Sequence, residues 1–121
     1  MHDYDYAVLR LVPDVRAEAF ENVGVALHSR TARLCALRVR LPEALPPGLD
    51  AALVARFVAG LEAVAAGEAS AGPIALLTPS ERFHFLTAPR STVVQVSPVR
   101  GGRCEAPAEA FEALFAHYVG A

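Results

Sequence analysis

Alternating hydrophobicity in the first third of the chain limits the possible folds more than any other feature. Segments 4–12, 22–28 and 33–41 each alternate apolar with polar or small residues, which is the pattern of a strand whose two faces differ. Residues 29–32 are the whole connection between the last two segments, and a link of this length closes a hairpin. Strands joined by hairpins run antiparallel, so the sequence predicts an antiparallel sheet.

Two later segments have the spacing of helices. Apolar residues recur three or four positions apart within residues 49–66, as in an amphipathic helix that packs on a sheet: Leu49, Leu53, Phe57, Leu61 and Val64. Residues 107–119 form a second such segment, and Pro107 suits the first turn of a helix. The order of strands and helices predicts a single α+β domain over residues 1–121, with both helices packed on one face of the mainly antiparallel sheet.

The remaining segments carry shorter signals. Residues 83–86 and 93–99 are short apolar runs that we expect to be strands. Residues 68–73 are rich in small side chains, which is typical of a loop. Gly101 and Gly102 predict a turn before the last helix.

Hydrogen-bonding side chains crowd the stretch from residue 81 to residue 98, where they alternate with apolar residues suited to a core. Burying one of them unpaired costs about 1–3 kcal/mol, so they must pair with one another, with backbone or with a ligand. Together with two residues of the early strands they form a candidate polar patch or anion-binding site: Arg10, Asn22, Arg82, His84, Arg90, Ser91, Thr92, Gln95 and Ser97. No known catalytic constellation can be read from these residues, so the sequence predicts no particular reaction.

Three residues of this patch have two interpretations. Arg10 and Arg90 can hold a carboxylate or phosphate, because the planar guanidinium suits both anions. Alternatively they pair with Glu18 or Glu21 and join the first strands to the later ones. His84 is either a general base, which needs a nucleophile or substrate nearby, or a structural histidine bonded to backbone or carboxylate.

The composition of the chain excludes several kinds of catalytic and binding site. All eleven basic residues are arginine, so the chain has no lysine for a Schiff base or a P-loop. The net charge of −2 argues against nucleic-acid binding by bulk electrostatics. The two cysteines lack CxxC spacing and the four histidines form no metal-binding pair, so we expect no metal site and no cofactor. No apolar stretch is long enough for a membrane span and no secretory signal is recognised, so we expect a cytoplasmic protein with reduced thiols.

Two blocks of residues, in this order, carry a family resemblance. The first is Tyr4-x-Tyr6-x-x-x-Arg10-x-x-Pro13, followed by Glu18 and Asn22-Val23-Gly24-Val25; the second is Arg82-Phe83-His84-x-Leu86-x-x-x-Arg90-Ser91-Thr92-x-x-Gln95-x-Ser97-Pro98. The chain resembles the bacterial domain-of-unknown-function 3037 family over nearly its whole length. The resemblance implies a small bacterial protein; some members are encoded beside kinase-like proteins related to the HipA toxins, which implies a partner role. The family often has a histidine shortly after its Ser-Pro, where this chain has Arg100, so no catalytic role is carried to that position.

The leading hypothesis is therefore an interaction protein that binds another bacterial protein, with a kinase-like protein as one class of partner. Residues 33–41 offer an edge strand to which a partner can add a strand, and Arg38 and Arg40 would protect that edge in the free protein. The alternative is a small enzyme or ligand-binding domain that takes an anionic ligand through Arg10 and Arg90. A third hypothesis, nucleic-acid binding, needs one basic face made of four side chains: Arg30, Arg33, Arg38 and Arg40.

Overall fold

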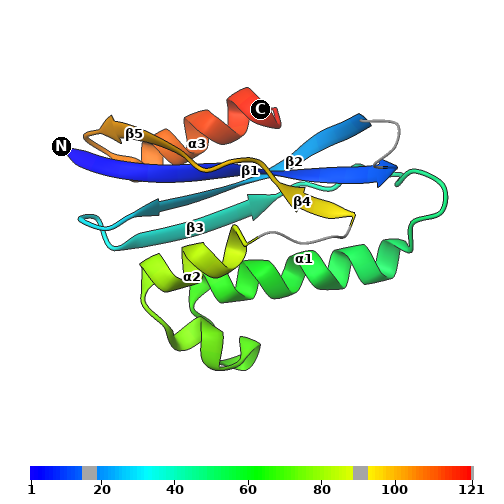
Figure 1. Cartoon of the computed structure of the whole chain (residues 1–121), viewed down its shortest axis with the longest axis horizontal. Coiled ribbons are helices and arrows are strands. Elements are labelled where there is room, and N and C mark those ends of the chain that lie inside the picture. Colours follow the sequence, from blue (N-terminus) through cyan, green and yellow to red (C-terminus); the bar gives the residue numbers. More distant parts are fainter. Residues whose placement is uncertain (15–18, 89–92, 121) are drawn as a thin grey trace.

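The computed structural model describes residues 1–14, 19–88 and 93–120, and these residues build a five-stranded antiparallel sheet (Figure 1). The strands, in chain order, are β1 His2–Asp14, β2 Ala19–Ser29, β3 Leu34–Val39, β4 Val94–Val96 and β5 Arg100–Cys104. Their order across the sheet is β3-β2-β1-β4, and β5 pairs with the first half of β1. The central strand is therefore β1, which pairs with β2, β4 and β5.

Three α-helices and two short 3-10 helices complete the described part of the fold: α1 Ala51–Ala66, η2 Ala69–Ala71, η3 Pro73–Leu76, α2 Pro79–Leu86 and α3 Pro107–Tyr118. The side chain of Asp50 caps the start of α1, and Gly67, with φ 72°, ends it. The expected α+β class, the antiparallel sheet and the two helices predicted from apolar spacing are thus confirmed. Within the described ranges, no helix combines the length and apolar character that crossing a membrane requires.

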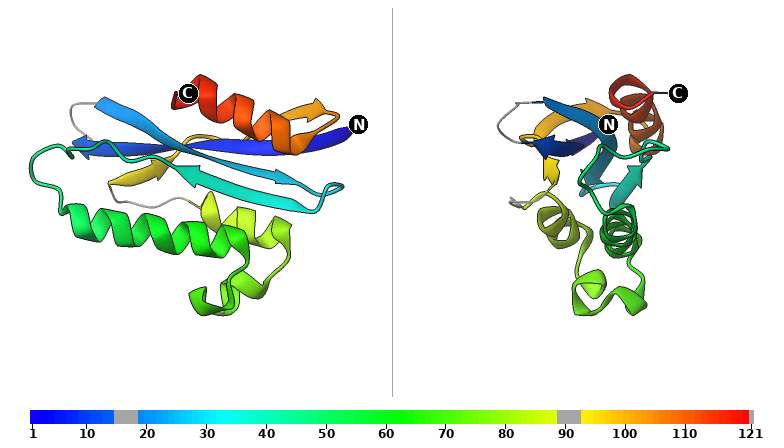
Figure 2. Two further views of the ribbon diagram at one scale, coloured as in Figure 1. Left: turned by 180° about the vertical axis from the view of Figure 1, so that it is seen from behind. Right: turned by 90° about the vertical axis from the view of Figure 1, so that its right-hand side faces the viewer.

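The helices lie on opposite faces of the sheet, which corrects the expectation that both predicted helices share one face (Figure 2). α1 and α2 cover one face, and α3 covers the other. Successive side chains of β3 point to opposite faces of the sheet. Leu37 packs against the core under α1, while the neighbouring Arg38 reaches Glu112 of α3. The physical reason lies in β2, which is buried without interruption from Val23 to Ser29. A strand buried on both faces needs a covering layer on each side.

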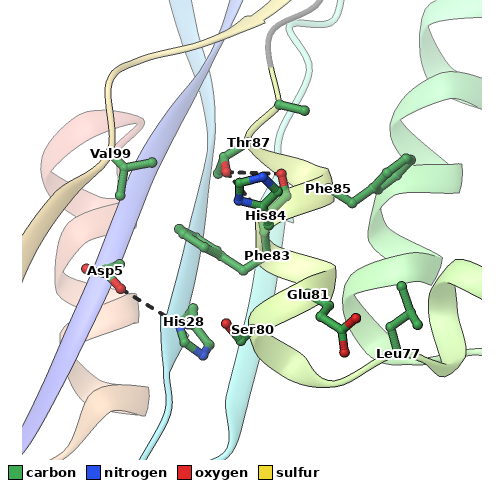
Figure 3. Close-up of a pocket in the computed structure, with 11 residues that line it drawn as sticks. Asp5, His28, Leu77, Ser80, Glu81, Phe83, His84, Phe85, Thr87 and Val99 are labelled. Atoms are coloured by element: carbon green, nitrogen blue, oxygen red, sulfur yellow. Dashed lines mark hydrogen bonds and ion pairs between the residues drawn. The ribbon is translucent and has the colours of Figure 1, made fainter.

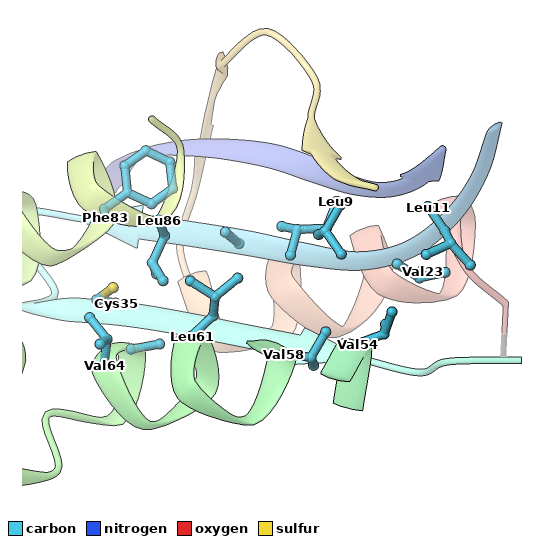
Figure 4. Packing of buried hydrophobic residues seen from close by; sticks show 13 residues of the cluster. Leu9, Leu11, Val23, Cys35, Val54, Val58, Leu61, Val64, Phe83 and Leu86 are labelled. Carbon is cyan, nitrogen blue, oxygen red and sulfur yellow. The ribbon is translucent and has the colours of Figure 1, made fainter. Parts of the chain in front are cut away.

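The face under α1 and α2 holds the main hydrophobic core (Figure 4). Leu9 and Leu11 of β1, Leu61 of α1 and Leu86 of α2 have side chains that are no more than 4% exposed. Burying one such side chain contributes about 1.5–3 kcal/mol to folding. The rest of the buried cluster is mostly aliphatic: Val23, Ala26, Cys35, Val54, Val58, Val64, Ala65, Phe83 and Val94.

A bulge in β2 changes which side chains reach this core. Leu9 pairs with Gly24, but the next residue of β1, Arg10, pairs with Asn22. Val23 is therefore an extra residue in β2, as in a β-bulge. The bulge brings Val23 into the core under α1 and α2, whereas unbroken alternation would turn it toward α3.

Residues 83–86, which we expected to form a strand, belong instead to α2. Thr78 begins this helix with a capping box: its hydroxyl accepts a hydrogen bond from the Glu81 N–H, and the Glu81 carboxylate accepts one from the Thr78 N–H. Pro79 occupies the first helical turn, where its missing N–H costs nothing. This start signal outweighs the short apolar run, so the prediction of a strand was wrong.

The prediction of a turn at Gly101 and Gly102 was also wrong, because both residues lie inside β5. They pair with Asp5 and Tyr4 of β1. A side chain at Gly102 would collide with the Tyr4 ring. Glycine at this position therefore allows the Tyr4 side chain to pack directly on the backbone of β5. The strand expected over residues 93–99 is shorter in the structure, where β4 covers Val94–Val96.

Candidate functional site

The structure divides the predicted polar patch between the two faces of the sheet. Arg10 pairs with Asn22 on one side and with Gln95 on the other, so these three residues are neighbours. Arg10 lies on the α3 face, which it shares with Tyr6. His84 belongs to α2 on the opposite face and lines a cleft that Arg10 does not reach. The sequence led us to expect one patch that contains both Arg10 and His84, and the structure corrects this by placing them on opposite faces of the sheet.

Among the described residues, the side chains of Arg10 and Asn22 each make one contact and keep further hydrogen-bonding capacity. The Cζ atom of Arg10 lies 4.4 Å from the centroid of the Phe20 ring, in a cation–π contact. The Asn22 Nδ2 donates to the carbonyl oxygen of Tyr118 at 3.2 Å, which ties β2 to the end of α3. The buried Nε of Arg10 and Oδ1 of Asn22 have no hydrogen-bond partner among the described residues.

Arg82 and Ser97 have structural partners. The Arg82 Nη1 donates to the carbonyl oxygen of Leu77 at 2.7 Å. The buried Ser97 Oγ accepts from the Val8 N–H at 2.9 Å and donates to the Pro98 carbonyl oxygen at 3.0 Å. Ser97 therefore fixes the chain between β4 and β5 to β1.

Arg90, Ser91 and Thr92 lie outside the described residues. The choice between Arg90 as an anion ligand and Arg90 as a structural ion pair therefore stays a prediction. Glu18, one of its proposed acidic partners, lies outside the described residues as well.

A cleft of about 730 Å³ opens between α2 and the strands β1 and β2 (Figure 3). His84 is exposed at its mouth, while Phe83 forms part of its wall. The lining combines rings, hydroxyls and charged groups: Asp5, His28, Leu77, Ser80, Glu81, Phe83, His84, Phe85, Thr87, Ala88 and Val99. Such a mixture of apolar surface and a few polar groups is typical of ligand clefts.

His28 is the most enclosed polar residue of this cleft, with only 7% of its surface exposed. Its ring stacks on Phe83 with the centroids 5.6 Å apart. Its Nδ1 lies 3.8 Å from Oδ2 of Asp5, a separation that suits an ion pair with a protonated imidazole but is too long for a hydrogen bond. The arrangement can orient a polar ligand. Ser80 also lines the cleft, and its hydroxyl has no hydrogen bond to a histidine or carboxylate among the described residues.

Both cysteines are free thiols. Burial raises the pKa of the Cys35 thiol, and the nearby Arg82 guanidinium opposes this by a smaller amount. Cys35 is therefore a weak nucleophile at neutral pH, and it packs as a small hydrophobic residue in the core. Among the described residues no group of three or more His, Cys, Asp or Glu side chains could hold a metal ion.

β3 is an edge strand, because it pairs with β2 alone in the part of the chain that the structure describes. The N–H of Arg40 donates to the carbonyl oxygen of Val23 in β2 at 2.7 Å. Backbone groups alternate in direction along a strand, so the N–H and C=O groups of Leu37 and Val39 point away from β2. We call this row of outward backbone groups, with the side chains of Arg38 and Arg40, the β3 edge.

Arg38 and Arg40 stand on the α3 side of the β3 edge. The Arg38 Nη1 lies 2.6 Å from Oε2 of Glu112, with the two side chains 50% and 61% exposed. Both guanidiniums also lie against the Phe115 ring, with Cζ 4.8 Å and 5.4 Å from its centroid. The two arginines and residues of α3 together line a hollow of about 390 Å³.

The four arginines needed for a single basic face are divided between two places. Arg38 and Arg40 lie beside α3, whereas Arg30 and Arg33 line a smaller hollow next to the start of α2. The division gives the nucleic-acid hypothesis no support from the arrangement of these side chains.

Sequence reasoning did not place Asp5, His28 and Ser80 together. Their proximity depends on the register in which Asp5 pairs with His28, and on α2 being a helix. The capping signal that begins at Thr78 could have revealed the helix, and with it the position of Ser80 in the first turn. The register between β1 and β2 has no comparable local signal.

Comparison with known proteins gives one match. The family model described as protein of unknown function, DUF3037, matches residues 6–119 and so confirms the resemblance seen in the sequence. No curated protein and no solved structure matches the chain.

Proposed function

We propose that this chain, which belongs to the DUF3037 family, is a small interaction protein whose β3 edge binds an extended, acidic segment of another protein. The observation that carries the proposal is the row of outward backbone groups on β3, which lies beside two arginine side chains. An extended segment can add to such an edge as a further strand, with affinity from backbone hydrogen bonds and specificity from alternate side chains.

The charges at the β3 edge determine the chemistry of the partner segment. The exposed Arg40 donates to the carbonyl oxygen of Val119 at 3.2 Å, and Arg38 faces the carboxylate of Glu112. The described residues that line the adjoining hollow thus include two guanidiniums and one carboxylate, so basic side chains outnumber acidic ones among them. Acidic residues on an added strand would be attracted, whereas the β3 edge of a second copy would be repelled.

The partner's class and its location form the rest of the proposal. Some family members are encoded beside kinase-like proteins, and this proximity of genes supports a kinase-like partner. The free state of both cysteines supports a reducing compartment, which for a bacterial protein is the cytoplasm.

An anionic ligand at Arg10 is the second candidate function. The observation that favours it is the pair of orphaned buried atoms, Arg10 Nε and Asn22 Oδ1, because a singly protonated phosphoryl group, which is still an anion, can accept from the first and donate to the second. NMR titration of the Arg10 Nε–H with acetate and inorganic phosphate tests it. A resonance unchanged by both anions would rule this function out.

The proposal for the β3 edge is tested by capture from a lysate of the organism that encodes the chain. Val39→Pro removes an outward N–H but no hydrogen bond to β2, and Arg40→Glu inverts the charge at the rim. Arg56→Glu, at an exposed position of α1, makes the same charge change away from β3 and is the matched control. Thermal melts of each bait establish that it is folded.

We expect wild type and Arg56→Glu to recover the same protein, and Val39→Pro and Arg40→Glu to recover little of it. The captured protein should then be expressed alone and mixed with each bait, so that direct binding is measured. Equal recovery by all folded baits, or recovery of nothing, would contradict a role for the β3 edge.

A further inference from the structure

A small hollow of about 360 Å³ lies between the turn that joins β2 to β3 and the first turn of α2. It is lined by basic and hydroxyl side chains: His28, Arg30, Arg33, Thr78, Pro79 and Ser80. We call it the turn hollow. It is separate from Arg10 and from the β3 edge, and neither of the two functions proposed above uses it.

Two guanidiniums of the turn hollow have no acidic partner in the part of the chain that the structure describes. Arg30 and Arg33 are both exposed, and neither forms an ion pair with any described residue. The other edge arginines differ, since Arg38 pairs with Glu112 and Arg103 pairs with Asp3. Two unneutralised guanidiniums in one hollow attract an anion, and their planar donors suit a phosphoryl group or a carboxylate.

The buried ring of His28 favours a phosphoryl group over a carboxylate. Its Nδ1 faces Asp5, while Figure 3 shows its other ring nitrogen pointing away from Asp5. This nitrogen donates to an anion when the imidazole is protonated, and also when the neutral ring carries its single proton there; when the proton of the neutral ring is on Nδ1 instead, this nitrogen accepts from the hydroxyl of a phosphate monoanion. A phosphate monoanion can therefore bond to His28 in all three states, whereas a carboxylate cannot bond when the neutral ring has its proton on Nδ1.

The first turn of α2 adds donors to the turn hollow. Pro79 has no N–H, and the Glu81 N–H is bonded to the Thr78 hydroxyl. Ser80 keeps both its N–H and its hydroxyl without a partner among the described residues, and it lines the hollow. The Glu81 carboxylate opposes an anion here, but it accepts hydrogen bonds from the Thr78 N–H and hydroxyl and does not line the hollow.

The turn hollow adjoins the larger cleft, because His28 and Ser80 line both. The cleft adds the rings of Phe83, Phe85 and His84, which suit an organic group. We propose that this chain binds a small organic phosphate, with its phosphoryl group at Arg30, Arg33 and Ser80 and its organic part in the cleft beside Phe83.

Arg33 also provides a clean way to test the site. It has a φ of 52°, in the left-handed region that glycine adopts at less cost. Arg33→Gly therefore removes the guanidinium at a position where the backbone accepts glycine. We expect this variant to fold as well as wild type, so lost binding would report on the site and not on unfolding.

The experiment is calorimetric and NMR titration of the full chain with phenyl phosphate and with inorganic phosphate. We expect phenyl phosphate to bind, to shift the His28 ring resonances, and to lose about tenfold or more in affinity with Arg33→Gly or Arg30→Gln. Arg100→Gln, at an exposed position of β5, is the control and should bind as wild type does.

Three outcomes would overturn the proposal. The first is no binding of phenyl phosphate by wild type, and the second is equal affinity in wild type and Arg33→Gly. Equal affinity for phenyl phosphate and inorganic phosphate would overturn the assignment of the organic part to the cleft, because the ring would then add nothing.

Discussion

The two helical layers are attached to the sheet by different kinds of contact. The α1 helix buries an aliphatic stripe in the main core: Val54, Val58, Leu61, Val64 and Ala65. The α3 helix has only Pro107 and Phe115 buried, and polar groups add several links between it and the sheet. One of these links joins the hydroxyls of Tyr6 and Tyr118, which lie 3.1 Å apart. Hydrophobic burial thus dominates the first layer, whereas the second combines buried apolar residues of the sheet, such as Val25 and Leu27, with hydrogen bonds, an ion pair and ring contacts.

This difference indicates where function can reside. A side chain that closes the α1 layer is unavailable to a partner, because exposing it would cost core stability. Arg38, beside α3, is half exposed and pairs with an exposed carboxylate, so a partner can recruit it at little cost to the fold. The comparison predicts large mutational effects in the α1 layer and small ones at the α3 contacts.

Leu61→Ala should have the largest effect on stability. The side chain is 4% exposed, so its loss leaves a cavity and should reduce the free energy of unfolding by about 2–5 kcal/mol. Leu53→Ala, on the same helix but 57% exposed, is the matched control and should change it by no more than about 0.5 kcal/mol. Urea unfolding measures both values, and similar losses in the two variants would refute the account of this layer.

Gly24→Ala should have the second largest effect on stability. Gly24 lies where β2 pairs with β3, and both helical layers pack on these two strands. A Cβ at this position would lie 2.7 Å from the Arg38 carbonyl oxygen and 2.9 Å from Cγ2 of Val39. Overpacking of this kind costs about 1–3 kcal/mol. Gly60→Ala, in α1 with open space around it, should instead stabilise the protein by about 0.5–1 kcal/mol. Thermal melts should therefore move in opposite directions for the two variants.

Tyr118→Phe should have a moderate effect on the α3 layer. It removes the hydrogen bond to Tyr6, which we expect to lower the free energy of unfolding by about 0.5–1.5 kcal/mol. The same bond is the main reason that the pKa of Tyr6 lies above its ordinary value of 10.0, so that pKa should fall in the variant. Ultraviolet titration of the tyrosines reads out this change, and an unchanged titration would mean that the bond does not form.

The sign of the pH dependence follows from the same contact. Because the pKa of Tyr6 is raised in the folded state, the stability that it contributes is fully present below pH 10.0. That contribution is lost as the pH rises through the higher pKa of the folded protein. Tyr118→Phe should therefore show less of this alkaline loss than wild type does.

Glu112→Gln should have the smallest effect. It breaks the ion pair with Arg38 at a surface where both side chains are at least half exposed, so we expect a loss of about 0.2–1 kcal/mol. The loss should shrink further in high salt. A loss above about 2 kcal/mol, measured by urea unfolding, would show that α3 depends on this pair and that Arg38 is not free for a partner.

Sequence patterns predict this fold where one periodicity dominates a segment. The alternation of β1 and β3 and the apolar stripe of α1 are local signals, and each identified its element. The face taken by α3 could not be predicted this way, because it depends on the burial of β2 on both sides. The position of Val23 could not be predicted either, since a bulge is a property of two paired strands.

The candidate sites show the same limit. The edge position of β3 was expected from Arg38 and Arg40, which alternate with apolar residues, and the strand order confirms it. The polar patch was expected from the polar side chains that crowd residues 81–98, and the structure separates its members because Asn22 lies on the α3 face whereas His84 belongs to α2 on the other face. The cleft around His28 depends on residues far apart in the chain, which no local pattern connects.

The central claim, that the β3 edge binds another protein, is tested most directly by amide hydrogen exchange at Leu37 and Val39. In the free protein these outward N–H groups have no strand beside them and should exchange faster than the Arg38 N–H, which points to β2. With the captured partner bound, we expect the exchange of Leu37 and Val39 to slow strongly, while exposed positions of α1 stay unchanged. Unchanged exchange at Leu37 and Val39 in a formed complex would contradict the claim.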